Sequence, residues 1–240
     1  MALNKKRMAR LLRTFLIALL LCGAIYVLGW SKLISVKTIA ITGTNQSSVL
    51  INSLSAAHIE LREGMPLARV DVRAINRISH QLGWISKSNI SRNWLNGSVS
   101  IQISERVPVA TYLDDDGSTK YFDATGNSFS APVAHSGLPA ITFSQSSAQT
   151  RIAAASWVAA MPSDLLSGMQ SLQVENVDQM VMKTQVTSTD SSSQKVITIN
   201  WGAVRDMPLK VKVLRALLLR PENEKRLLFD LTNPLAPITR

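Results

Sequence analysis

The run SVSIQISERVPVA, from Ser98 to Ala110, constrains the fold of this chain more than any other stretch. Apolar and polar residues alternate over its first seven positions, and this period of two predicts a strand with one buried face. The alternation stops at Glu105, Arg106 and Pro108, and proline cannot donate a hydrogen bond to a strand ladder. We therefore expect the strand to end here and a second domain to follow almost without a linker.

The residues before this run predict the rest of a small α+β domain. Leu95-Asn96-Gly97 is a hairpin turn, since Asn-Gly between two strand-like runs is a strong short-range hairpin signal. Further upstream, Asp71 is a candidate N-cap for a helix. The expected elements are a strand at 36–42, helices at 48–57 and 72–83, and strands at 84–94 and 98–107. This order predicts a mixed sheet with both helices on one face.

The residues from about 109 to 232 predict a second domain, mostly antiparallel β with helices. Strands are expected near 109–113, 120–123, 171–176, 179–188, 195–202 and 226–234, and helices near 146–162 and 208–221. The basic residues of the second helix are expected to face solvent, and residues 188–194 are expected to form a polar loop. Asp114-Asp115-Asp116 fits a solvated turn better than a calcium loop, because EF-hand spacing is missing.

The net charge of +10 is concentrated at the N-terminus, where five basic residues lie within the first 13 positions and no acidic residue is present. Thr14 to Ser31 follows without a charge, and extension to 14–34 predicts one transmembrane helix. The basic residues would keep 1–13 in the cytoplasm and place the remainder outside. A cleavable signal peptide is the rival interpretation, but no small-x-small cleavage site is evident. Basic residues interleaved with aromatics, as in a nucleic-acid groove, are missing elsewhere.

Residues that could carry out catalysis are sparse and scattered. His58, His80 and His135 are far apart in the sequence, and none belongs to a metal-binding motif. The single cysteine, Cys22, lies in the apolar N-terminal run, and no nucleophile or nucleotide-binding signature is present. We expect a protein that is not an enzyme and takes no cofactor, metal or small-molecule substrate; an extracytoplasmic hydrolase is the less favoured alternative.

An ordered set of residues between 37 and 110 resembles the single polypeptide-transport-associated (POTRA) domain of the FtsQ/DivIB family of bacterial cell-division proteins. The matching residues are Gly43, Gly64, Leu67, Trp84, Arg92, Trp94, Glu105, Arg106, Pro108 and Ala110. Two positions depart from the family pattern, Gly83 and Leu95, where prolines are usual. The second half resembles the family's β domain at Trp201-Gly202, at Lys210 and in the final run LFDLTNP with Asp230.

The resemblance implies a POTRA domain over 35–107, a β domain over 108–232 and a tail at 233–240. It also implies a single-pass scaffold of the division machinery in the cell membrane at the septum. Such a protein recruits and links FtsB/DivIC-like and FtsL-like partners, together with other division components, and supports septal wall synthesis. A POTRA-type chaperone of protein export or assembly is the alternative.

Two sets of residues are candidates for function. The final strand is expected at or near a sheet edge, whose unpaired backbone groups a partner strand can use. This partner-binding set is Arg226, Leu227, Leu228, Phe229, Asp230 and Leu231. The second set is the domain junction, Glu105, Arg106 and Pro108, where a salt bridge or hydrogen bond is expected to hold the domains in line.

Overall fold

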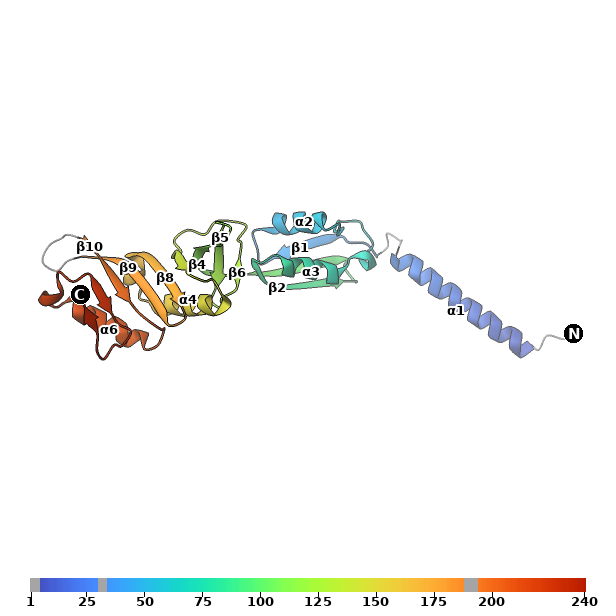
Figure 1. The fold of residues 1–240 in the computed structure, drawn as a ribbon. Coiled ribbons are helices and arrows are strands. Elements are labelled where there is room, and N and C mark those ends of the chain that lie inside the picture. The colour runs from blue at the N-terminus through green and yellow to red at the C-terminus, as the bar shows by residue number, and fades with distance from the viewer. Residues whose placement is uncertain (1–4, 30–33, 188–193) are drawn as a thin grey trace. The chain divides into compact units, whose positions relative to one another are not determined.

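The computed structural model describes residues 5–29, 34–187 and 194–240 of this α+β protein. Its contacts divide the chain into two units, Met1–Glu105 and Arg106–Arg240 (Figure 1). The predicted polar loop at 188–194 falls almost entirely outside the described residues.

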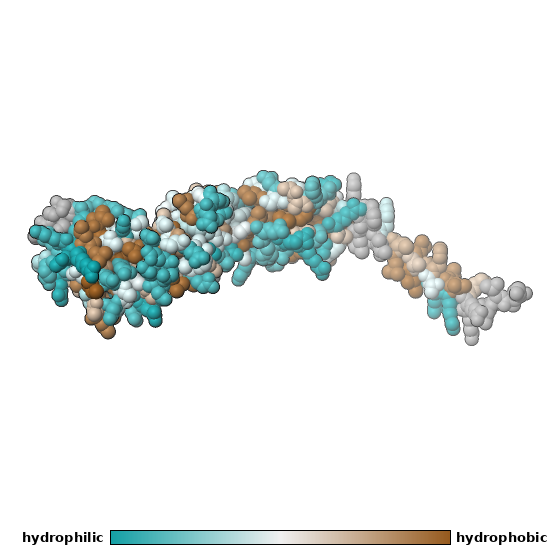
Figure 2. Space-filling model, in the orientation of Figure 1, coloured by the Kyte–Doolittle hydropathy of each residue, from teal (hydrophilic) through white to brown (hydrophobic). Residues whose placement is uncertain are grey.

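The first unit begins with helix α1 (Lys5–Gly29), so most of the predicted cytoplasmic tail is helical. Figure 2 shows apolar side chains along much of this helix. Within the described residues, however, no helix combines the length and apolar character needed to cross a membrane. The predictions of a transmembrane helix at 14–34 and of a single-pass membrane protein are therefore wrong. Within the described residues, the uncharged part of α1 is Thr14 to Gly29, about 24 Å at ~1.5 Å per residue, against a ~30 Å hydrocarbon core.

The remainder of unit 1 has the expected order of strand, two helices and two strands. The elements are β1 (Thr38–Thr42), α2 (Ser47–Ala56), the 3-10 turn η2 (Leu67–Arg69), α3 (Val72–Gln81), β2 (Ile85–Asn93) and β3 (Ser98–Glu105). The sheet order is β1-β3-β2, with β3 parallel to β1 and antiparallel to β2. The long hairpin leaves β3 in the centre, so β1 and β2 are both outer strands.

The core of unit 1 lies on one face of this sheet, under α2 and α3 (Figure 1). The alternation in β3 is confirmed, because Val99, Ile101 and Ile103 are buried there. Asp71 caps α3 as predicted: its carboxylate accepts a hydrogen bond from the Ala74 amide at 2.9 Å. The predicted turn is confirmed as well, with Gly97 at a φ of +72°.

In the part of unit 2 that the structure describes, the strands form two sheets. The first is β4 (Pro108–Leu113), β5 (Thr119–Asp123) and β6 (Ser128–Phe129). The second has the order β12-β11-β10-β9-β8-β7 and consists of β7 (Ile141–Phe143), β8 (Met169–Asn176), β9 (Gln179–Thr187), β10 (Gln194–Asn200), β11 (Leu228–Asp230) and β12 (Ile238–Thr239). Its helices are α4 (Ala148–Ala160), α5 (Ser163–Ser167), α6 (Met207–Leu218) and the 3-10 turn η3 (Pro221–Asn223). The two strands β7 and β12 therefore bound the larger sheet.

One hydrophobic core joins the larger sheet to α4 and α6. Trp157 of α4 meets Trp201, which follows β10, edge to face at a centroid distance of 6.1 Å. Both indoles are fully buried, as are Leu214 of α6 and Phe229 of β11. The buried Phe229 fixes the register of β11, because a slip of one residue would turn this ring to the other face.

Candidate protein-interaction surfaces

The predicted partner-binding strand is shorter than expected and lies one position inside the edge. Only Leu228–Asp230 is strand, β11, and it pairs in parallel with β10. Its other side is covered by β12, in which Thr239 lies opposite Phe229. The expectation of an open edge along Arg226–Leu231 therefore needs correction: the segment expected to be a tail turns back and takes up the hydrogen bonds of β11.

The outermost strand on this side is β12. Leu228 and Arg240 each donate a backbone hydrogen bond to the carbonyl of the other, both at 3.0 Å. The backbone N–H and C=O of Arg240 therefore point toward β11. Because backbone groups alternate in direction along a strand, the N–H and C=O of Thr239 point away from β11. Among the described residues, no strand pairs with this outer side of β12. The sheet thus ends in an edge that can receive another strand.

Exposed apolar and basic side chains surround this edge. Leu227, Leu235 and Ile238 are 55%, 85% and 50% exposed. Arg226 and Arg240 are exposed as well. Apolar surface beside unpaired backbone groups is typical of a protein-binding site. The positive charge favours a partner segment that carries acidic residues.

A buried lysine holds the loop that follows β10. Lys210 of α6 is 2% exposed, and its ammonium donates to the carbonyls of Trp201 at 2.6 Å and Ala203 at 2.8 Å. Burial lowers the pKa of Lys210, and nearby Asp206 opposes that shift. The expectation that the basic residues of this helix face solvent is wrong for Lys210. Lys210 directly precedes Val211, which was expected on the buried face of this helix. The sequence does not show that carbonyl oxygens of the loop after β10 lie within hydrogen-bond distance of the Lys210 ammonium.

The loop is fixed at its other end by Gly202 and Asn200. Gly202 has a φ of +61° and donates its N–H to the Asn200 side-chain oxygen at 3.2 Å. The Asn200 amide also donates to the Asp230 carboxylate at 3.3 Å. The residues that carry the resemblance here, Trp201-Gly202, Lys210 and Asp230, are therefore parts of one hydrogen-bonded support for the β10–β11 pair.

The predicted junction residues bond into separate units. The Glu105 carboxylate accepts a hydrogen bond from the Thr44 hydroxyl in unit 1. The Arg106 guanidinium pairs with the Asp123 carboxylate in unit 2 at 2.6 Å. Pro108 opens β4 opposite Asp123, and β3 has already ended at Glu105. Glu105 thus bonds to unit 1, whereas Arg106 and Pro108 hold the start of unit 2 beside Asp123.

Asp123 organises the turn after β5 as well as binding Arg106. It accepts hydrogen bonds from the Thr125 amide and hydroxyl at 2.9 and 2.6 Å and from the Asn127 amide at 3.1 Å. Burial alone would raise the pKa of Asp123, but the hydrogen bonds from Thr125, Arg106 and Asn127 lower it overall. The carboxylate is therefore ionised when folded.

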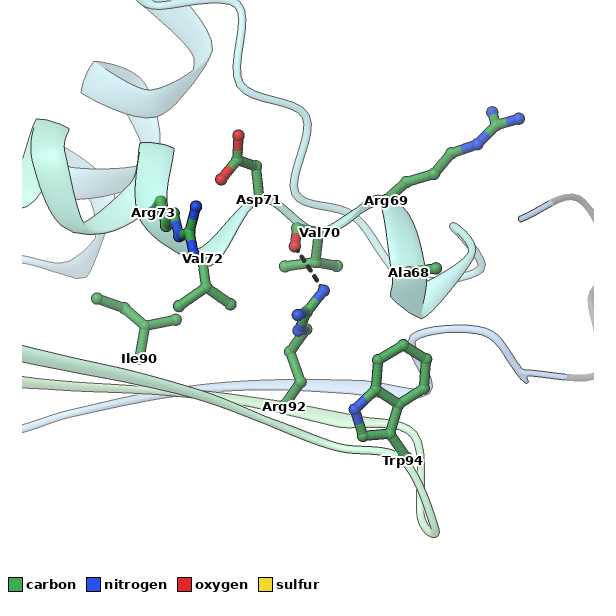
Figure 3. A pocket seen from close by; sticks show the side chains of 9 residues that line it. All are labelled: Ala68, Arg69, Val70, Asp71, Val72, Arg73, Ile90, Arg92 and Trp94. Carbon is green, nitrogen blue, oxygen red and sulfur yellow. Dashed lines mark hydrogen bonds between the residues drawn. The ribbon is translucent and has the colours of Figure 1, made fainter. Parts of the chain in front are cut away.

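Unit 1 has a groove between β2 and the segment Ala68–Arg73, with a volume of about 740 Å³ (Figure 3). Arg92 rises into it from β2 and donates to the carbonyls of Leu67 and Val70 at 3.3 and 3.0 Å. Its guanidinium carbon also lies 5.3 Å from the centre of the Trp94 ring. Arg92 lies in β2 and Trp94 directly follows this strand, so the Arg-x-Trp spacing directs both side chains to one face. This pair holds the chain before α3 against the sheet, which is a structural role.

His58 and His80 belong to unit 1, and His135 belongs to unit 2. No group of three or more His, Cys, Asp or Glu residues in the described ranges could hold a metal ion. In the comparisons with known proteins, no family model and no curated protein matches the chain.

Proposed function

We propose that this protein is a non-enzymatic scaffold that binds an extended segment of a partner protein along β12. The observation that carries the proposal is the open outer side of β12, where the backbone N–H and C=O of Thr239 point away from β11. A strand that adds there would form main-chain hydrogen bonds, which are independent of side-chain identity. Leu235 and Ile238 would supply apolar contacts that select the partner.

The resemblance to FtsQ/DivIB proteins gives this scaffold a biological setting. In that setting the partner is an FtsB/DivIC-like protein, with an FtsL-like protein joined to it, at the division septum. The protein would link these partners and so support septal wall synthesis. The basic residues beside β12 favour a partner segment with acidic residues, which charge attraction would steer to the edge.

Two proline variants of β12 test the proposal. Thr239→Pro removes an outward N–H, so it should reduce capture of the FtsB-like protein at least tenfold and leave the unit folded. Ile238→Pro removes an inward N–H that pairs with β11, so it should also loosen β12. Capture is measured with the immobilised full chain, and hydrogen exchange in β11 reports whether β12 stays in place.

A matched control separates the backbone from the side chain. Thr239→Val keeps the outward N–H and a β-branched side chain, so capture should stay within twofold of the wild type. It also removes the hydroxyl contact to the Asn223 side chain at 3.2 Å, which is present in the wild type. Capture by Thr239→Pro at the wild-type level would refute strand addition at β12.

A further inference from the structure

Of the two outer strands of the sheet in unit 1, β1 lacks the features that usually keep a sheet edge from pairing, whereas β2 has them. The edge strand β2 carries Lys87 and Arg92 and has an irregular register between Ile85 and Lys87. In contrast, β1 is the uncharged sequence Thr-Ile-Ala-Ile-Thr, with neither proline nor bulge. Charges and bulges are the ordinary means of blocking edge-to-edge association. Among the described residues, no strand pairs with the outer side of Thr38–Thr42. The chain at Gly64 and Met65 covers that side only before β1 begins, where both residues form backbone hydrogen bonds with Val36 at 2.8 Å.

A shallow apolar groove runs beside this edge on the helix-covered face. It has a volume of about 320 Å³ and is lined by Ile39 and Ile41 of β1, Ser47 and Ile51 of α2, and Leu61. Ile51 is 45% exposed. Thr38, Ala40 and Thr42 point to the opposite, open face and are exposed. An added strand would therefore cover apolar side chains on one face only.

The sequence of β1 reads the same in both directions about Ala40. In an antiparallel pair of two copies centred there, Ala40 meets Ala40, Ile39 meets Ile41 and Thr38 meets Thr42. Residues that are directly opposite point to the same face, so apolar residues meet apolar ones and hydroxyls meet hydroxyls. A two-fold axis makes such an interface self-complementary.

The charges at the ends of β1 are also compatible with this pairing. In the same register Lys37 of one copy lies opposite Gly43 of the second copy. The hydroxyl of the neighbouring Thr44 donates a hydrogen bond to the carboxylate of Glu105, which is exposed. Each Lys37 thus comes close to Glu105 of the second copy, and the two Lys37 residues are about 20 Å apart at ~3.4 Å per residue. Opposite charges therefore approach at both ends of the pair.

We propose that two copies of this protein associate through antiparallel pairing of their β1 strands, with Ala40 on the two-fold axis. The pairing would join two three-stranded sheets into one of six strands. It uses a different edge from β12, so it goes beyond the partner binding proposed above. Because β1 has only five residues, the interface is small and the association weak.

Disulfide trapping in the full chain tests the register directly. Cys22 is the only cysteine and is first replaced by serine. Ala40→Cys should then form a covalent dimer under mild oxidation, at least fivefold more than Asn89→Cys on the exposed β2 edge. Thr38→Cys and Thr42→Cys proteins of different size should cross-link when mixed. Each alone should cross-link poorly, because like positions are about 14 Å apart and a disulfide needs Cα atoms within ~7 Å.

A charge placed on the axis provides the second arm. Ala40→Lys should lower the Thr38→Cys/Thr42→Cys cross-link at least tenfold, whereas Ala40→Thr should leave it unchanged. Ala40 is exposed, so both variants should keep the circular dichroism spectrum of the wild type. Cross-linking of the mixture no better than of its separate components would overturn the proposal. If the two copies associated through another surface, residues 38 and 42 of different copies would not lie opposite each other, and mixing the two cysteine variants would not increase cross-linking.

Discussion

The pair of Arg106 and Asp123 offers a quantitative test of how the start of unit 2 is held. Their side chains are 23% and 12% exposed and their charged atoms lie 2.6 Å apart, so solvent screens the pair less than a surface salt bridge. A hydrogen bond to a charged group contributes about 1.5–3 kcal/mol. Arg106→Ala and Asp123→Asn should each destabilise unit 2 by about 2 kcal/mol. Asn retains an oxygen that can accept the Thr125 and Asn127 hydrogen bonds.

Asp123→Ala should cost more, because it also removes the acceptor that organises the turn. The turn donors can reach water, so about 0.5–1 kcal/mol is lost for each of three bonds. The expected total is about 4 kcal/mol. The double variant Arg106→Ala/Asp123→Asn should cost little more than either single change, since both remove one interaction.

Native-state hydrogen exchange of the full chain measures these differences within unit 2, with β3 of unit 1 as an internal reference. A loss of about 2 kcal/mol corresponds to roughly thirtyfold faster exchange of the slowest amides, and a loss of about 4 kcal/mol to roughly a thousandfold. Because the folded pKa of Asp123 is lowered, the unfolded chain binds more protons between that value and the ordinary 3.8. The advantage of the wild type over Asp123→Asn should therefore persist above pH 4 and disappear as pH falls through the lowered pKa. Equal exchange in wild type, Asp123→Asn and Asp123→Ala at neutral pH would refute this reasoning.

Gly43 and Lys210 each support one unit, and substitutions test both roles. Gly43→Ala should destabilise unit 1 by at least about 3 kcal/mol in thermal unfolding, because Gly43 has a φ of +81° and the added Cβ would lie 2.0 Å from the Ile103 carbonyl oxygen. Gly64 has the same φ, but an added Cβ would meet open space, so Gly64→Ala should cost only about 1–2 kcal/mol. Equal destabilisation by the two variants would contradict the argument. Lys210→Met should destabilise unit 2 by about 2–4 kcal/mol by leaving the Trp201 and Ala203 carbonyls without their donor. Burial lowers the pKa of Lys210 in the folded protein, so between that pKa and 10.5 the unfolded chain binds more protons than the folded one. The difference in unfolding free energy between the wild type and Lys210→Met should therefore grow as pH rises through this range. A difference that becomes smaller there would refute the prediction.

Local patterns in the sequence were sufficient for most of the secondary structure. The alternation of β3, the Asn-Gly turn and the Asp71 cap each depend on residues close together in the chain, and the structure contains all three. Local pattern failed at the N-terminus, where an uncharged run suggested a membrane span that α1 does not provide.

The candidate interaction surfaces depended on pairing between distant segments, which local patterns cannot show. Whether β11 or β12 is outermost follows from the return of residues 238–240 onto 228–230, across a loop with no strand signal. Lys210 is buried because the loop after β10 presents two carbonyls to it, and Arg106 meets Asp123 across 17 residues. The palindrome of β1 was readable in the sequence, but only the sheet order β1-β3-β2 placed it at an edge. Strand order follows from burial of whole faces against a shared core, so the sequence determined the elements and the tertiary structure determined which edges remain open.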